Sequence, residues 1–137
     1  DELIQEIKRN PKISRFIHLP IQSGSNRILY LMNRGYTRED YVKIIHKIKK
    51  EIPQATFGTD IIVGFPGETE DDFQETVSLV KEVGFQIGFV AQYSPRPGTA
   101  AFRIYKDDVG PQTKKQRFRI LEDLINRPHL SHRPHVP

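Results

Sequence analysis

The segment 58–69, Gly-Thr-Asp-Ile-Ile-Val-Gly-Phe-Pro-Gly-Glu-Thr, limits the possible folds more than any other part of the chain. Residues 61–63 form the short apolar run that a strand buried on both faces needs. The Gly-Phe-Pro-Gly turn at 64–67 ends that strand, and Thr69 is a suitable N-cap for a following helix. In parallel α/β folds ligands bind at such a turn, between a strand's carboxyl end and a helix N-terminus. A connection that only has to be tight has the same pattern, so both interpretations stay open.

Strands and helices alternate along the chain, which predicts an α/β fold with a parallel sheet. The apolar patterns place strands at residues 13–19, 55–63 and 86–93. A polar or glycine- and proline-rich turn follows each strand. Because parallel strands end at the same edge of a sheet, we expect the three turns to share one rim and to form a site together.

Capping signals predict where the helices between the strands begin and end. Ser25 or Asn26 is expected to cap a short helix that Gly35 terminates, and Thr37 to cap the next one. A Thr-Lys-Lys-Gln capping box at 113–116 predicts the start of the last helix. A buried stripe is expected on the helix after Thr37, at Tyr41, Ile44, Ile45 and Ile48. The acidic face of the helix after Thr69, which includes Asp72, is expected to be solvated.

Composition excludes several classes of protein. The chain has 137 residues, enough for one domain, with 36% hydrophobic residues and a mean hydropathy of −0.54. No run approaches the roughly 20 apolar residues of a membrane span. The absence of cysteine excludes disulfides, thiolate metal sites and thiol nucleophiles. The net charge of +4 suits a surface that faces RNA or phosphate, although ordinary domains also have it.

The segment 127–137 differs from the rest of the chain. It repeats Arg-Pro-His and shows no apolar periodicity, so we expect it to be a disordered tail beyond a domain at 1–126. Its three histidines come with no carboxylate or fixed scaffold, so no metal site is predicted there or elsewhere.

Four motifs occur in order along the chain. The first two are His-Leu-Pro-Ile-Gln-Ser-Gly-Ser at 18–25 and Met-Asn-Arg-Gly-Tyr-Thr at 32–37. The third is the segment 59–69 described above, and the fourth is Tyr-Ser-Pro-Arg-Pro-Gly-Thr at 93–99. Together they resemble the radical SAM methylthiotransferases, in particular the tRNA-modifying branch. The resemblance covers residues 1–126. It implies a partial (β/α)₆ barrel, of which this chain is the C-terminal half.

The chain also departs from that family. The family binds a [4Fe–4S] cluster through a C-x₃-C-x₂-C loop and a second cluster through three more cysteines in an N-terminal domain, and this chain has no cysteine. The family's RNA-binding β domain should follow the last helix, where the Pro/His-rich tail stands instead. We therefore expect no catalytic residue in this chain and no activity from it alone.

The resemblance implies a function for the intact enzyme. Such an enzyme uses S-adenosylmethionine and two [4Fe–4S] clusters to add a methylthio group to C2 of N6-isopentenyladenosine beside the tRNA anticodon. It is expected to be a cytoplasmic monomer without membrane contact, reduced by a flavodoxin or ferredoxin. Two alternatives stay open. The chain is a non-catalytic barrel piece that binds nucleotide or RNA, or the enzyme acts on another tRNA adenosine or on a ribosomal protein.

The resemblance also assigns residues to the cofactor. Contacts with S-adenosylmethionine are expected from Gln22, Ser23, Ile62, Val63, Gly64 and Tyr93. The polar pair at 22–23 suits the ribose and methionine end of the cofactor. Residues 62–64 would lie along adenine, and Tyr93 would help to close that pocket. Residues 62 and 63 could instead be barrel filling, and Tyr93 could be a packing residue.

Two arginines on the rim loops are the expected RNA contacts. Arg34 and Arg96 could meet a tRNA phosphate or a carboxylate. Arg34 could equally be a solvated helix end. His18 lies inside a predicted strand, so we expect a hydrogen-bonded core histidine rather than a base or a ligand.

Overall fold

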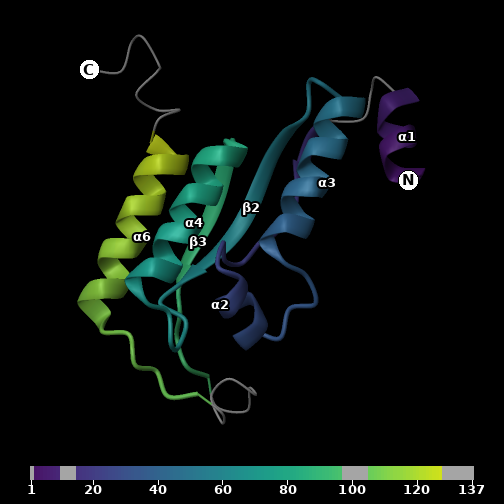
Figure 1. Ribbon diagram of the computed structural model, residues 1–137. Coiled ribbons are helices and arrows are strands. Elements are labelled where there is room, and N and C mark those ends of the chain that lie inside the picture. The colour runs from purple at the N-terminus through teal and green to yellow at the C-terminus, as the bar shows by residue number, and fades with distance from the viewer. Residues whose placement is uncertain (1, 10–14, 97–104, 128–137) are drawn as a thin grey trace, which may run out of the picture.

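Three parallel strands form one open sheet in the computed structural model, which describes residues 2–9, 15–96 and 105–127 (Figure 1). The strands follow one another across the sheet in chain order, as β1 (Phe16–His18), β2 (Thr56–Val63) and β3 (Ile87–Gln92). The predicted α/β class and the parallel sheet are confirmed, and the sheet is consistent with part of a barrel. Residues 13 and 14, which begin the first predicted strand, lie outside the described residues.

The register of the sheet sets which turns meet. Phe16 pairs with Thr56 and His18 with Gly58, and the pairing of β2 with β3 begins at Gly58 opposite Ile87. Beyond β1 the chain keeps contact with β2, because the backbone of Gln22 bonds to both neighbours of Ile61. The carboxyl ends of all three strands therefore lie together, at the lower end of the sheet in Figure 1.

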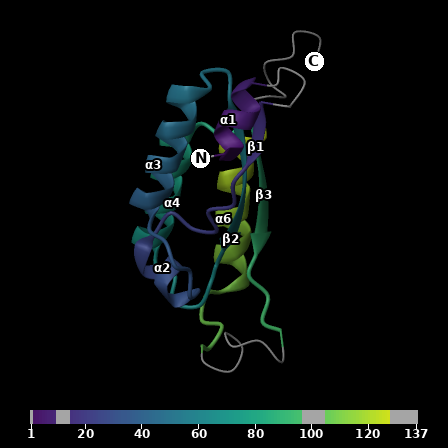
Figure 2. The ribbon, with the colours of Figure 1, turned by 90° about the vertical axis from the view of Figure 1, so that its right-hand side faces the viewer.

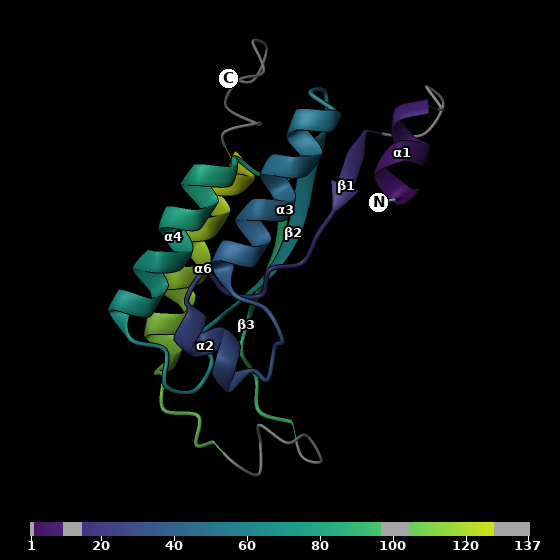
Figure 3. The same ribbon diagram turned by 45° about the vertical axis from the view of Figure 1, so that its right-hand side comes forward.

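Helices cover one face of this sheet. The described helices are α1 (Glu2–Arg9), α2 (Asn26–Leu31), α3 (Arg38–Glu51), α4 (Glu70–Val83) and α6 (Pro111–Ile125), of which α3, α4 and α6 pack on that face. Helices α3 and α4 lie side by side in front of the sheet in Figure 3, and α6 packs against β3 and α4. Helix α1 lies at the outer edge, beyond β1, in Figure 3.

The two faces of the sheet differ in exposure. On β2 the helix-covered face carries Phe57, Thr59, Ile61 and Val63, all buried. The open face carries the alternate side chains, among them Phe16, His18, Asp60, Ile87 and Phe89. Seen nearly along the sheet in Figure 2, α3 and α4 lie on one side of β2 and β3. The alternation follows from the two-residue period of a strand.

The core lies between the helices and the helix-covered face. Phe57, Phe73 and Leu79 are among its fully buried side chains. The stripe predicted on α3 is confirmed at Tyr41, Ile45 and Ile48. The prediction is wrong for Ile44, which is 49% exposed because it sits at the edge of the stripe that faces solvent.

Most of the predicted helix starts are confirmed. Ser25 caps α2, and Thr37 and Thr69 cap α3 and α4 in reciprocal capping boxes with Asp40 and Asp72. Two boundaries differ from the prediction, one at the end of α2 and one at the start of α6, and each has a local cause.

Helix α2 ends before Gly35. Asn33 takes the left-handed conformation (φ 61°), and the Asn33 and Arg34 amides donate to Tyr30 and Leu29 carbonyls in a Schellman arrangement. Helix α6 begins at Pro111 after Gly110, which makes no side-chain cap bond. Proline at the first helical position needs no amide partner, so the Thr113 box is not used.

No helix within the described ranges is both long enough and apolar enough to cross a bilayer.

Candidate functional site

A pocket of about 710 Å³ lies at the carboxyl ends of the strands. It is formed by the end of α2 and the loop after it, by the ends of β2 and β3, and by the segment before α6. Its lining residues are Tyr30, Leu31, Met32, Asn33, Arg34, Ile62, Phe65, Ala91, Gln92, Tyr93, Ser94, Arg96 and Tyr105. The volume lies in the range of about 300–1,000 Å³ that small-molecule sites usually have. The sequence predicted a site at this rim.

Four of the predicted site residues line this pocket. Ile62 is the last open-face side chain of β2, and Tyr93 directly follows β3. Arg34 and Arg96 come from the two rim loops and are both exposed. The structure thus brings together two apolar or aromatic residues and two guanidinium groups from three separate segments.

Aromatic rings make one wall of the pocket. The ring of Phe65 packs edge-on against Tyr93 at a centroid distance of 5.2 Å and against Tyr105 at 6.0 Å. Such pairs add specific geometry to the burial of apolar area. A wall of this kind suits a flat, partly apolar ligand group, such as a purine.

Gln22 lies beside the pocket in an unusual backbone conformation. Its backbone φ is 75°, which lies in the left-handed region that residues other than glycine and asparagine rarely adopt. Its amide donates to the Asp60 carbonyl at 2.8 Å, and its carbonyl accepts from the Ile62 amide at 3.0 Å. The half-buried side chain does not line the pocket. An outlier of this kind, held by two backbone bonds to β2, is typical of functional loops.

Two tyrosines hold the loop that carries Gln22. The Tyr41 hydroxyl donates to the Leu19 carbonyl at 2.5 Å, and the Tyr36 hydroxyl donates to the Ile21 carbonyl at 3.1 Å. Burial raises the pKa of Tyr41 to about 12 and also raises the pKa of Tyr36. Both phenols therefore stay protonated as donors at neutral pH, so the loop is fixed from the α3 side.

Ser23 faces α4 rather than the pocket. Its side chain is fully buried, its Oγ lies 3.4 Å from Thr76 Oγ1, and it accepts from the Ser25 amide at 3.1 Å. The neighbouring Gly24 amide donates to Thr76 Oγ1, and a Cβ at Gly24 would come within 2.5 Å of the α4 backbone. The Ser-Gly-Ser sequence thus lets the loop lie directly on α4.

Val63 and Gly64 also lie behind the pocket. The Val63 side chain is fully buried on the helix-covered face, and its carbonyl accepts from the Tyr93 amide at 2.8 Å. Gly64 has a φ of 78°, and a Cβ there would lie 2.4 Å from Lys114 Cγ. The contact expected from residues 62–64 is therefore available from the Ile62 side chain, while the next two residues shape the backbone beneath it.

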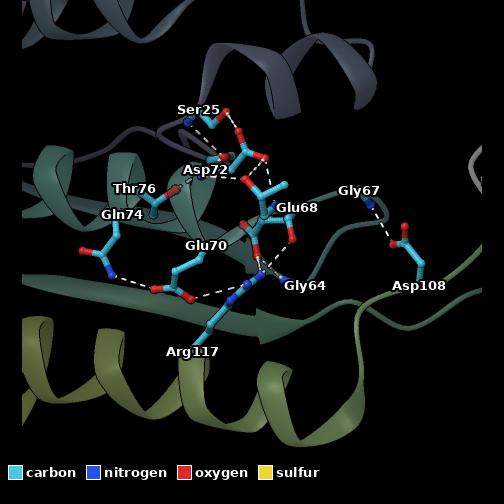
Figure 4. Close-up of polar contacts among 12 residues, drawn as sticks. Ser25, Gly64, Gly67, Glu68, Glu70, Asp72, Gln74, Thr76, Asp108 and Arg117 are labelled. Atoms are coloured by element: carbon cyan, nitrogen blue, oxygen red, sulfur yellow. Dashed lines mark hydrogen bonds and ion pairs between the residues drawn. The ribbon is translucent and has the colours of Figure 1, made fainter.

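A buried ion pair closes the turn at 64–68 (Figure 4). Glu68 Oε1 accepts from the Gly64 amide and from Arg117, each at 2.8 Å, and Arg117 also donates to the Glu68 carbonyl. Their side chains are 1% and 7% exposed. Burial raises the pKa of Glu68, while the bonds from Gly64 and Arg117 act in the opposite direction.

A second buried cation on α6 reaches the end of β3. Lys114 Nζ donates to the Tyr93 carbonyl at 3.0 Å and to Asp107 Oδ2 at 2.8 Å. The ammonium also lies 5.5 Å from the centre of the Tyr93 ring. The carbon stem of Lys114 packs on Gly64. One side chain therefore contacts both strand ends that border the pocket.

Asp72 joins α2 to α4, and its expected place on a solvated face is wrong. Its carboxylate accepts from Ser25 Oγ, from the Thr69 amide and from Arg27, which also donates to the Gly67 carbonyl. Burial would raise its pKa, but the bonds from Arg27, Thr69 and Ser25 outweigh burial and lower the pKa to about 2. Figure 4 shows Ser25 directed at this carboxylate.

Sequence reasoning missed Asp72, Lys114 and Arg117, all of which are buried. Lys114 and Arg117 stand two turns and one turn before Leu121 on the same helical stripe, but a charged side chain does not by itself indicate burial. The signal for Asp72 was its position as the fourth residue of the Thr69 capping box.

A second polar pair lies on the open face, away from the pocket wall. His18 Nε2 lies 3.2 Å from Asp60 Oδ2, and both side chains are more than a third exposed. The His18 ring also meets Phe89 edge-on at 5.9 Å. The expectation of a core histidine is wrong, because His18 stands on the face that the helices leave uncovered.

The donor set decides which cofactors this chain can hold. No group of three or more His, Cys, Asp or Glu suited to a metal was found within residues 2–9, 15–96 and 105–127. With no cysteine in the sequence, the chain itself does not fit an iron–sulfur cluster. The aromatic and apolar side chains of the pocket suit a purine ring such as the adenine of S-adenosylmethionine.

The chain was compared with known proteins. The sequence profile of the Radical SAM superfamily matches residues 1–80. Three similar relatives each bear the name tRNA-2-methylthio-N(6)-dimethylallyladenosine synthase. The relative from Thermotoga petrophila is 50% identical over 127 residues, which are 93% of this chain and 29% of the relative.

The other two relatives give a similar result. The protein from Oceanobacillus iheyensis is 51% identical over 93% of this chain and 24% of its own length. The protein from Thermus thermophilus is 53% identical over 89% of this chain and 26% of its own length. The chain therefore spans about a quarter of the length of the relatives it matches.

Proposed function

Because the chain belongs to the radical SAM superfamily, we propose that it forms the C-terminal half of the barrel of a tRNA methylthiotransferase. The observation that carries the proposal is the pocket at the strand ends, where Arg34, Ile62, Tyr93 and Arg96 meet. Support comes from relatives that are 50 to 53% identical and are named for this reaction.

The proposed reaction adds a methylthio group to C2 of N6-isopentenyladenosine next to the anticodon. S-adenosylmethionine and two [4Fe–4S] clusters would supply the radical chemistry and the sulfur, and the cluster ligands would come from other parts of the enzyme. The residues of this chain would orient the cofactor and exclude water from it. This chain alone would be inactive, since it has no cysteine.

Within the proposed cofactor site, Ile62 and the ring of Tyr93 would flank adenine. Gln22 would bond to the ribose or the methionine end through a rotation of its half-buried side chain. Ser23, Val63 and Gly64 would support the cofactor site through the backbone. The Ser23 side chain faces α4, the Val63 side chain faces the core, and a Cβ at Gly64 would meet Lys114.

Arg34 and Arg96 would meet the tRNA. Both line the pocket and both are exposed, and they come from two different loops. Guanidinium groups at the mouth of a pocket suit the phosphates that flank a base inserted into it. The net charge of +4 agrees with such a partner.

The wider setting is also part of the proposal. The intact enzyme would be a cytoplasmic monomer reduced by a flavodoxin or ferredoxin. Residues 1–126 would belong to the barrel. The segment 127–137 would be a tail, and all of it but Arg127 lies outside the described residues.

A second candidate is a barrel piece that binds nucleotide or RNA without catalysis. The absence of cysteine favours it, because no cluster can be held by this chain itself. Action on another tRNA adenosine or on a ribosomal protein is a further alternative. The alternatives differ from the main proposal in their outcome: the first predicts binding without catalysis, and the second predicts modification of another substrate.

The test uses a chimera, in which this chain replaces the matching segment of the Thermotoga petrophila relative. Two substitutions separate the cofactor from the RNA. Gln22→Ala should impair cleavage of S-adenosylmethionine with or without tRNA, measured as 5′-deoxyadenosine. Arg96→Ala should weaken tRNA binding and flatten its log-salt slope by about one unit, as expected for one lost phosphate contact.

The opposite pattern would contradict the proposal. If Arg96→Ala abolished cleavage without tRNA while leaving tRNA binding and its salt slope unchanged, the assignment of the two loops would be wrong. A chimera that binds tRNA but never cleaves the cofactor would favour the non-catalytic alternative.

A further inference from the structure

Helix α6 places two cations beneath the pocket, where an amphipathic helix ordinarily carries apolar residues. Lys114 and Arg117 have side chains that are 9% and 7% exposed. The packing of the same helix is otherwise supplied by Leu121 and Ile125, which are almost completely buried. Two buried charges therefore stand at the pocket end of α6, and an apolar pair stands at the far end.

Arg117 acts on the turn after β2. Its guanidinium donates to the side chain and to the carbonyl of Glu68. Glu68 in turn accepts from the Gly64 amide and donates its own amide to the Phe65 carbonyl at 2.9 Å. Figure 4 shows Arg117 pointing from α6 at Gly64 and Glu68. The backbone on both sides of Phe65 is thus tied to α6.

Lys114 acts on the segments that carry the other two rings of the aromatic wall. Its ammonium bonds to the Tyr93 carbonyl, and it bonds to Asp107, two residues after Tyr105. The rings of Tyr93 and Tyr105 both pack on Phe65. All three rings of the wall therefore depend on backbone that α6 holds in place.

These charges are poorly explained by stability alone. Buried ion pairs can often be replaced by apolar residues of similar volume without loss of stability, because burying charge is costly. The arrangement is also incompletely satisfied. Arg117 Nε and Asp107 Oδ1 are buried and have no hydrogen-bond partner in the part of the chain that the structure describes. Buried polar groups in native structures nearly always have a partner, so these two atoms are exceptions that need an explanation beyond packing.

We propose that Lys114 and Arg117 are positioning residues, which hold the aromatic wall of Phe65, Tyr93 and Tyr105 in the shape that receives the ligand. Neither side chain lines the pocket, so they act through the turn at 64–68 and the end of β3. The inference depends on the proposed function only for the identity of the ligand, S-adenosylmethionine.

The direct test observes the wall without any ligand. The full chain is labelled with 3-fluorotyrosine, and ¹⁹F NMR resolves its five tyrosines. Lys114→Met keeps the stem that packs on Gly64 and removes the ammonium. It should shift and broaden the signals of Tyr93 and Tyr105 and leave those of Tyr36 and Tyr41 unchanged. If Lys114→Met does not fold, Asp107→Asn replaces it in the test. This variant removes the charged partner of Lys114 and should give the same pattern.

Leu121→Ala is the matched control on the same helix. It removes a fully buried core side chain and so lowers stability without touching the network. The proposal predicts that this variant leaves the Tyr93 and Tyr105 signals in place at a temperature where it is folded. Equal changes in all five signals, or the same changes from Leu121→Ala, would overturn it.

The second measurement is binding of S-adenosylmethionine to the cluster-loaded chimera by equilibrium dialysis. Lys114→Met and Arg117→Met should weaken binding by about tenfold, the effect of disordering one wall of a site. Arg117→Lys, which keeps the charge opposite Glu68, should recover part of the affinity, and Leu121→Ala should bind as the parent does. Unchanged affinity in Lys114→Met and Arg117→Met would overturn the inference, whereas a parent chimera without affinity would overturn the proposed function and leave the tyrosine result to stand.

Discussion

The two faces of the β-sheet differ in how far their side chains are buried. On the helix-covered face, apolar side chains such as Phe57 and Ile61 are buried, and the polar groups of the turns are paired with buried partners such as Asp72 and Arg117. On the open face, Phe89 is 60% exposed and Ile87 is 38% exposed. The helices of this chain cover one face of the sheet and leave the other exposed.

The difference shows what kind of unit the chain is. Exposed aromatic and aliphatic residues on the two outer strands, β1 and β3, form a surface that soluble proteins usually cover. In a closed barrel this face would be the interior, packed with side chains from other strands. The open face is therefore consistent with a section of a larger barrel, and the pocket stands where the two faces meet at the strand ends.

The largest expected difference between the faces is in stability. Phe73→Ala removes a side chain of α4 that is fully buried against the helix-covered face, and it should lower the free energy of unfolding by about 3–5 kcal/mol. Phe89→Ala removes the same side chain from the open face and should cost less than about 0.5 kcal/mol. Urea unfolding of the 137-residue chain measures both.

Equal losses from the two substitutions would contradict this comparison. They would mean that the open face is covered in solution, by the tail or by a second copy of the chain. Sedimentation velocity of the parent chain would separate those two causes.

The next largest effect is a pH dependence that belongs to the helix-covered side. The pKa of Asp72 is about 2 in the folded chain against 3.8 ordinarily. A depressed pKa adds stability above the unfolded value, and that stability is lost as the pH falls through the folded value. The contribution is about 2 kcal/mol, present at about pH 5 and lost progressively toward about pH 2.

Asp72→Asn tests this assignment. The parent should lose about 2 kcal/mol more than the variant when unfolding free energies at about pH 5 and about pH 2 are compared. Parallel pH profiles would show that Asp72 is not held by Arg27, Ser25 and Thr69 as described.

The smallest expected effect concerns the pair on the open face. His18 and Asp60 are both partly exposed, so a double-mutant cycle with His18→Ala and Asp60→Ala should give a coupling below about 1 kcal/mol. The same cycle with Arg117→Ala and Glu68→Ala should give a clearly larger coupling, since that pair is buried. A larger coupling for His18 and Asp60 would mean that the pair is shielded from water, so that the open face is covered in solution.

Most of the fold could be predicted because it rests on local and periodic signals. The strand at 55–63 follows from its apolar run, and the starts of α3 and α4 follow from Thr37 and Thr69, whose side chains cap within three residues. The helix boundaries that were predicted wrongly are those where two nearby residues could end or begin the helix at similar energy. Asn33 ends α2 two residues before Gly35, because asparagine tolerates the left-handed conformation nearly as well as glycine.

The candidate site was predicted in part. Arg34, Ile62, Tyr93 and Arg96 were placed at one rim, since parallel strands end together, and they do line one pocket. Whether a given loop residue faces the pocket or the core depends on tertiary packing. Ser23 therefore lies against Thr76, although its sequence position is as suitable as that of Gln22.

The partners of the buried charges could not be predicted from local pattern. Lys114 and Arg117 lie on a helix whose other charged residues meet water, and their partners Asp107 and Glu68 are 7 and 49 residues away in the chain. Contacts at such separations are set by the whole fold. The sequence alone therefore identifies the rim of the site but not the network that supports it.

We propose that this chain is a section of the radical SAM barrel of an enzyme that methylthiolates tRNA. The most direct measurement is nucleoside mass spectrometry of tRNA bearing N6-isopentenyladenosine, after incubation with the cluster-loaded chimera, S-adenosylmethionine and a reductant. The account predicts formation of the 2-methylthio nucleoside, and its loss in the chimera that carries Gln22→Ala. A folded chimera with its full iron content that cleaves S-adenosylmethionine yet never forms this nucleoside would contradict it.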